Sequence, residues 1–294
     1  MGETIALVKK STVDIVADKI RQFQDSGELH FPANYSPENA LKSAWLVLQS
    51  VEDKAHRPAL EVCTRDSIAN SLLDMVVQGL NPAKNQCYFI VYGNKLTCQR
   101  SYLGTMAVTK SATGARDIFA EVVYKGDDFA FEIVRGKKRV TKHVQTVETI
   151  EQGEIVGAYC TLVDADDREF TEFMTIAEIK QAWKQSKMNS ESEGSTHNKF
   201  PQEMCKKTVI NRACKTFLNS SDDSSLVMKH YRRTETEAEQ ASVEAEISEN
   251  ANQQPIDVEY QFQDSQAPTD AEQSSFDFDA APQMKKAASG DPPF

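Results

Sequence analysis

Apolar residues recur at helical spacing in several stretches of this chain. Ser36 can cap a helix that has Pro37 in its first position, where the missing N–H costs nothing. A second helix is predicted after Asp66, which we take as its cap, and Gly79 ends it. Thr175 and Glu178 form a capping box that starts another helix. Two further helices are predicted over residues 101–112 and about 201–218.

Runs of β-prone residues predict a set of short strands. Residues 87–92 and 95–99 flank Gly93-Asn94, which is typical of a β-hairpin. Further strands are predicted at 117–124, 129–134, 140–147, 154–163 and 169–174. Helices and strands are grouped and do not alternate, which favours an α+β fold with helices around a central antiparallel β-meander.

Charge divides the chain into two parts. Residues 234–294 contain 14 acidic and two basic residues, whereas residues 1–233 contain 30 acidic and 31 basic ones. The tail is also poor in Leu, Val and Ile, so it has little apolar surface to offset the entropy of ordering. We therefore predict a core at 1–233 and a disordered acidic tail at 234–294 that serves protein partners, although a merely solubilising tail has the same composition. The net charge of −11 does not argue against a polyanionic ligand for the core.

Composition argues against a membrane or secreted protein. No stretch of 18 apolar residues occurs, and the first residues contain no apolar signal core. The cysteines are scattered, with no C-x-x-C pair and no histidine at zinc-finger spacing. We expect reduced thiols and a cytoplasmic location. The six cysteines are Cys63, Cys87, Cys98, Cys160, Cys205 and Cys214.

Several fragments resemble catalytic motifs, but each is incomplete. Residues 104–111 nearly match the phosphate-binding loop G-x-x-x-x-G-K-[ST], with β-branched Thr109 in place of the second glycine. That stretch is also predicted to be helical, whereas a phosphate cradle needs a bare loop. Glu52-Asp53-Lys54 and Glu178-Ile179-Lys180 have the E-x-K spacing of nucleases but no partner carboxylate on a nearby strand. We expect no enzyme activity and no cofactor.

The helix predicted at 201–218 places a lysine on its apolar side. At 100° per residue, Lys206 lies within the apolar arc, whereas Lys207, Arg212 and Lys215 lie with Asn211 on the polar face. A buried ammonium costs several kcal/mol without a partner. Lys206 therefore pairs with a carboxylate, reaches the rim of a groove, or binds an anion; the sequence leaves these three alternatives open.

Basic and aromatic residues also gather around the predicted hairpin. Lys95, Thr97 and Gln99 share one face of a strand, and Arg100 and Tyr102 follow. Charge, side-chain amides and an aromatic plane together suit single-stranded nucleic acid. Residues 135–142 contain five bases and no acid, so this stretch is either a finger that contacts phosphates or a solvated loop.

Six motifs, in their order and spacing between about Thr64 and Leu218, resemble the RecT family of phage single-strand annealing recombinases. The family often has a basic residue where this chain has Asn211. The motifs are Leu80-Asn81-Pro82-Ala83, Tyr88-Phe89, the stretch from Gln99 to Gly104, the stretch from Val122 to Phe129, Gly157-Ala158-Tyr159, and the stretch from Phe200 to Thr208.

The resemblance implies ATP-independent binding of single-stranded DNA, annealing to a complementary strand, and retention of the duplex. It implies a homo-oligomer, as a ring or helical filament, and a phage 5′–3′ exonuclease as partner in a bacterial cell. The tail is then a candidate site for host single-stranded-DNA-binding protein or its partners. A general single-stranded-DNA-binding accessory protein is the alternative. The residues we expect at the DNA are Lys95, Gln99, Arg100, Tyr102, Lys110, Lys206, Lys207, Arg212 and Lys215.

Overall fold

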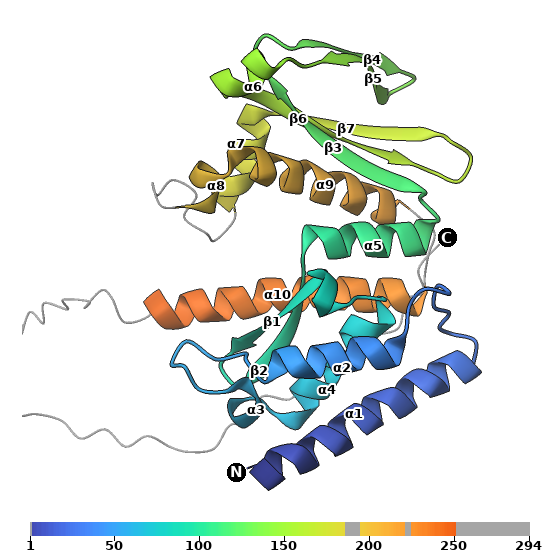
Figure 1. Cartoon of the computed structure of the whole chain (residues 1–294), viewed down its shortest axis with the longest axis vertical. Coiled ribbons are helices and arrows are strands. Elements are labelled where there is room, and N and C mark those ends of the chain that lie inside the picture. Colours follow the sequence, from blue (N-terminus) through green and yellow to red (C-terminus); the bar gives the residue numbers. More distant parts are fainter. Residues whose placement is uncertain (1, 186–194, 221–224, 251–294) are drawn as a thin grey trace, which may run out of the picture. The chain divides into compact units, whose positions relative to one another are not determined.

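The computed structural model describes residues 2–185, 195–220 and 225–250 (Figure 1). All of the described residues belong to one compact unit. It contains two hydrophobic clusters, and each cluster is formed by its own group of elements. Helices α5 (Tyr102–Thr113) and α9 (Pro201–Asn219) contribute residues to both clusters. All cysteines are buried free thiols. Within the described ranges, no helix is long and apolar enough to span a bilayer.

The first group consists of helices around the hairpin β1–β2. Strands β1 and β2 pair around Gly93, whose φ of 59° suits a tight turn. Trp45, Leu72 and Met75 are fully buried in the core between the helices and the hairpin. The elements of this group are α1 (Gly2–Asp25), α2 (Pro37–Leu48), α3 (Ala59–Val62), α4 (Arg65–Val77), η1 (Pro82–Lys84), β1 (Cys87–Tyr92), β2 (Lys95–Arg100) and α10 (Leu226–Asn250).

The second group is a five-stranded antiparallel sheet covered by α7 and α9 (Figure 1). The strand order is β3-β6-β7-β5-β4. Ile118, Ala158 and Met174 pack against Val209 and Ala213 of α9 in the second core cluster. The elements are β3 (Asp117–Tyr124), β4 (Asp128–Val134), β5 (Lys137–Val144), α6 (Val147–Gln152), β6 (Ile155–Val163), β7 (Glu169–Thr175), α7 (Ile176–Gln185) and α8 (Thr196–Lys199).

The predicted α+β class and antiparallel sheet are confirmed, and most helix caps are as predicted. The Ser36 hydroxyl accepts a hydrogen bond from Asn39 N, and Glu178 accepts one from Thr175 N. Thr64, not Asp66, caps α4, because its hydroxyl accepts the Ser67 N–H while Asp66 lies in the first turn.

Two predicted boundaries differ from the structure, and the helices α1, α3, α6 and α8 were not predicted. The two-residue turn Arg135-Gly136 is enough to connect the strands, so β5 already begins at Lys137. It ends before residue 146, because Thr146 caps α6. Most of the basic stretch at 135–142 is therefore strand. Helix α10 continues past residue 234, where we expected the tail to begin, because Tyr231 and Thr234 are buried against the first group. Residues 251–294, which belong to the predicted acidic tail, lie outside the described residues. Residues 196–199 form the short helix α8.

Candidate nucleic-acid interface

Helix α9 presents one buried and one basic face. Pro201 occupies its first turn, and an apolar stripe packs against the sheet and α5. Lys207, Arg212 and Lys215 are exposed, as the helical wheel predicts. The buried stripe consists of Cys205, Val209, Ile210, Ala213, Cys214 and Leu218.

Lys206 meets a carboxylate. Its Nζ lies 2.7 Å from Oε1 of Glu121 on edge strand β3, and the lysine side chain is 29% exposed. Of the three alternatives that the sequence leaves open, the structure therefore has the ion pair. An ion pair that is partly open to solvent contributes about 0–1 kcal/mol, so a phosphate can compete for this lysine.

Arg212 shares an acceptor with a lysine of the hairpin β4–β5. Glu172 Oε1 lies 3.3 Å from Arg212 Nε and 3.2 Å from Lys138 Nζ. Lys138 also donates to the Phe173 carbonyl at 3.0 Å, which fixes it against β7. One carboxylate therefore faces two cations here.

Lys207 is exposed near the buried ring of His197. No ion pair of Lys207 is found among the described residues, and its charge is close enough to influence the imidazole. Burial, with Lys207 adding to it, lowers the pKa of His197. Lys207 is thus an available cation on α9.

The β2 residues predicted to lie together differ in accessibility. Lys95 and Gln99 are exposed, but Thr97 between them is buried, because α4 and α10 pack on β2. Lys95 lines a cavity of about 400 Å³ whose wall includes Glu237 of α10. Burial raises the pKa of Glu237, and Lys95 is among the cations that counteract this effect.

Arg100 is bound to protein atoms. Its Nη1 donates to Gln78 Oε1 at 2.8 Å, to the Tyr231 carbonyl at 3.1 Å and to the Thr234 hydroxyl. Its guanidinium carbon also lies 3.8 Å from the centre of the Tyr231 ring. Burial lowers the pKa of Arg100. This arginine therefore attaches α10 to β2 and α4.

Lys215 pairs with Glu235, a glutamate of α10. Its Nζ lies 2.7 Å from Glu235 Oε1, and the same glutamate counteracts the desolvation of Arg100. The sequence analysis places the end of the core at residue 233 and so does not predict the pair between Lys215 and Glu235. The helical spacing of Met228, Tyr231 and Thr234 indicates that the helix continues beyond that point.

Lys110 stands at the end of α5, where its Nζ pairs with Asp117 at 3.0 Å. It lines a cavity of about 310 Å³ together with Lys84 of η1. The two lysines suit phosphates, whereas the amide oxygens of Gln78, Asn81 and Gln86 already accept hydrogen bonds within the protein. No sequence pattern indicates this cavity, because its lining comes from segments far apart in the chain. Its amide-bearing lining residues are Asn34, Gln78, Asn81 and Gln86.

Tyr102 begins α5 and packs, half-buried, against the second core cluster. Residues 104–111, the near match to a phosphate-binding loop, are helical. Gly104 serves close packing instead, since a Cβ at this position would clash with the Gln86 carbonyl oxygen. In the described part of the chain, no group of three or more His, Cys, Asp or Glu side chains is placed to hold a metal ion.

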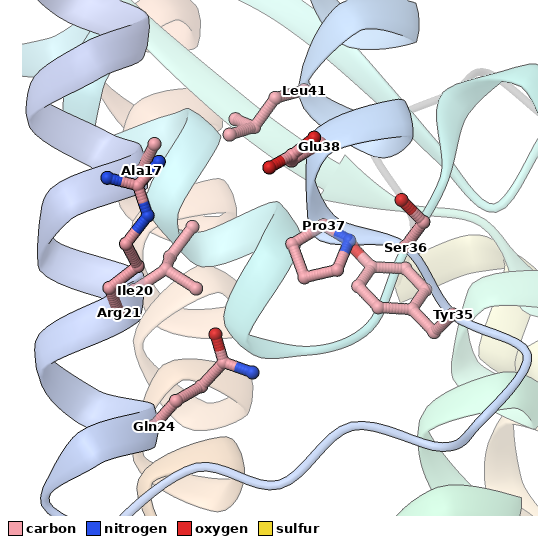
Figure 2. A pocket seen from close by; sticks show the side chains of 9 residues that line it. All are labelled: Ala17, Ile20, Arg21, Gln24, Tyr35, Ser36, Pro37, Glu38 and Leu41. Carbon is pink, nitrogen blue, oxygen red and sulfur yellow. The ribbon is translucent and has the colours of Figure 1, made fainter.

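A third cavity, of about 370 Å³, contains none of the residues predicted to bind DNA. It lies between α1 and α2, and Figure 2 shows Arg21, Gln24 and Glu38 around it. Arg21 pairs with Asp18 at 2.9 Å. We assign this cavity no role.

Comparison with known proteins identifies the family. The model of the RecT family matches residues 38–251, from α2 through α10. No match was found among curated proteins. The family match extends beyond the motifs seen in the sequence and includes the whole of helix α10, which Arg100 and Asp74 hold in place. The chain therefore belongs to the RecT family, whose members are single-strand annealing proteins of DNA recombination.

Proposed function

We propose that this protein binds single-stranded DNA without sequence preference and anneals complementary strands without ATP, as an oligomer on DNA. The family match over residues 38–251 carries this proposal. The exposed cations on α9 and the cation- and amide-lined cavity next to α5 support it.

Annealing requires that two polyanions approach each other. A row of Lys and Arg side chains can neutralise the phosphates while the base edges stay free to pair. Binding then depends steeply on salt, because each neutralised phosphate releases counterions. No covalent step is needed.

The ion pairs of the free protein suggest how DNA is accepted. Lys206, Arg212 and Lys215 are each paired with a carboxylate at a partly exposed site, and such pairs are weak. A phosphate can replace the carboxylate at little cost. We propose Lys95, Gln99, Lys110, Lys206, Lys207, Arg212 and Lys215 as DNA contacts. Arg100 and Tyr102 then position their neighbours. The Arg100 guanidinium is engaged with neutral protein groups, and Tyr102 is half-buried.

The proposed setting follows from the family resemblance. A phage 5′–3′ exonuclease supplies the single strand in a bacterial cell that carries the phage or prophage. The acidic C-terminal residues engage host single-stranded-DNA-binding protein or its partners. The assembly is a ring or a helical filament.

A fluorescence assay with two complementary oligonucleotides tests the function. We expect annealing without nucleotide, retention of the duplex, and inhibition by raised salt. Binding that blocks pairing would instead identify a general single-stranded-DNA-binding protein. Shortening of the DNA in Mg²⁺ would identify a nuclease.

A further inference from the structure

The hairpin β4–β5 has two ends that differ in chemistry. It joins the rest of the sheet through the pairing of Lys138 with Thr171. Figure 1 shows its turn at one end and α6 at the other. Asp127, before β4, holds the α6 end, because its carboxylate accepts from Thr149 Oγ1 at 2.6 Å and from Gln145 Nε2 at 2.9 Å.

One face of the hairpin is already occupied. The ring centres of Phe129 and Tyr159 are 5.8 Å apart, and those of Phe131 and Phe173 are 5.1 Å apart. These aromatic contacts fold the hairpin onto β6 and β7. The two ends of the hairpin lie beyond this stack.

The turn end is apolar and basic. Ile133 is 65% exposed and Val134 48% exposed. Arg135, Lys137 and Arg139 are also exposed, and no ion pair of these three is found among the described residues. We call these five residues the tip patch.

The α6 end is apolar and acidic. Val147 is 71% exposed and Ile150 46% exposed. Glu148 and Glu151 on the same helix are exposed, again without an ion pair in the part of the chain that the structure describes. Val147, Glu148, Ile150 and Glu151 form what we call the base patch.

The two patches are complementary but cannot meet within one chain. A seven-residue strand separates them, which corresponds to roughly 20 Å. Their charges point to a partner, because exposed cations at one end match exposed carboxylates at the other. A second copy of the chain offers the complementary patch.

We propose that the tip patch of one protomer docks on the base patch of the next, with aliphatic side chains at the centre and Arg135 and Lys137 facing Glu148 and Glu151. The proposal rests on the oligomeric function proposed above and adds the contact surface. Two different patches make a head-to-tail contact, which closes into a ring or continues as a helical filament.

Charge reversal at each end tests this interface in the full-length protein, by analytical ultracentrifugation with and without complementary oligonucleotides. The tip variant is Arg135→Asp/Lys137→Glu, because Asp tolerates the positive φ of residue 135. The base variant is Glu148→Lys/Glu151→Lys. Lys42→Glu/Lys229→Glu, at exposed lysines on other helices, is the control for a loss of positive charge.

Each reversal alone should raise the protein concentration needed for assembly roughly tenfold or more, because like charges then face each other. An equimolar mixture of the two variants should assemble again, as should the chain that carries both reversals. The control should assemble like the wild type. Circular dichroism verifies that every variant is folded.

The interface would be overturned if either single reversal assembled like the wild type. It would also be overturned if neither the mixture nor the chain with both reversals regained assembly. Failure to recover is also the result expected if the tip bases bind phosphate instead. A wild-type protein that stays monomeric would overturn the interface too. Strand annealing is measured on the same samples, so a wild type that assembles but does not anneal would contradict the proposed function alone.

Discussion

Asp74 of α4 anchors helix α10, alongside Arg100. It is buried in α4, its Oδ1 lies 2.6 Å from His230 Nδ1, and it also pairs with Arg233. Removing Asp74 leaves buried His230 without its partner and Arg233 with Glu237 at 3.8 Å, and the loss of one partner from a buried charged interaction costs about 3–5 kcal/mol. We expect Asp74→Ala to lower the free energy of unfolding by about that amount in urea denaturation.

The exposed pair of Asp18 and Arg21, at 2.9 Å, provides the matched control. Asp18→Ala should cost at most about 1 kcal/mol, because exposed ion pairs contribute little. Equal losses in both variants would show that the buried cluster does not hold α10.

At the scale of elements, Asp127 makes the anchor of the β4–β5 hairpin sensitive to acid. Burial alone would raise its pKa, but hydrogen bonds from Thr149, Gln145, Tyr124 N and His143 outweigh this effect and lower the pKa to about 2. A carboxyl whose pKa is lowered by folding stabilises the fold at pH values above its ordinary pKa of 3.8. This stabilisation is lost as the pH falls towards 2.

The consequence is measurable with Asp127→Asn, which cannot ionise. Wild type should be more stable than this variant at pH 5, by roughly 1–3 kcal/mol, since hydrogen bonds to a buried carboxylate are lost. The difference should shrink as the pH falls from about 4 to 2 in parallel urea titrations. A difference that is constant over this range would contradict the role of the charge.

Local signals were sufficient for the strands and for α2, α4, α5, α7 and α9, but not for the long helices α1 and α10 or the short helices α3, α6 and α8. The bounds of β3 match the prediction because alternation and turn residues act within a few positions. Helix α10 was missed because Arg100 and Asp74, which hold it, lie more than 100 residues away in the chain. Strand β5 begins three residues before the predicted start at 140, because a basic run between two strands favours a finger or a solvated loop, whereas Lys138 is half-buried against Glu172.

The same limit applies to the candidate site. The basic face of α9 follows from helical spacing alone, and the structure confirms which residues are buried. Sequence spacing could not reveal that Glu121, Glu172 and Glu235 face three of the cations, because these partners come from other elements. At the scale of the whole molecule, Lys206, Arg212 and Lys215 are thus paired with carboxylates from other elements, and we propose that each of these three can exchange its carboxylate for a phosphate.

This exchange predicts opposite effects for the two members of one pair. Lys206→Ala should weaken binding to single-stranded DNA and reduce the slope of log affinity against log salt by about 0.7 for one lost phosphate contact. Arg212→Ala should do the same. Glu121→Gln, which frees Lys206 from its 2.7 Å pair, should instead strengthen binding without reducing the slope. Fluorescence anisotropy at several salt concentrations measures all three variants. If both cation variants kept the wild-type affinity and slope, α9 would not be the DNA contact, whatever the annealing activity of the protein.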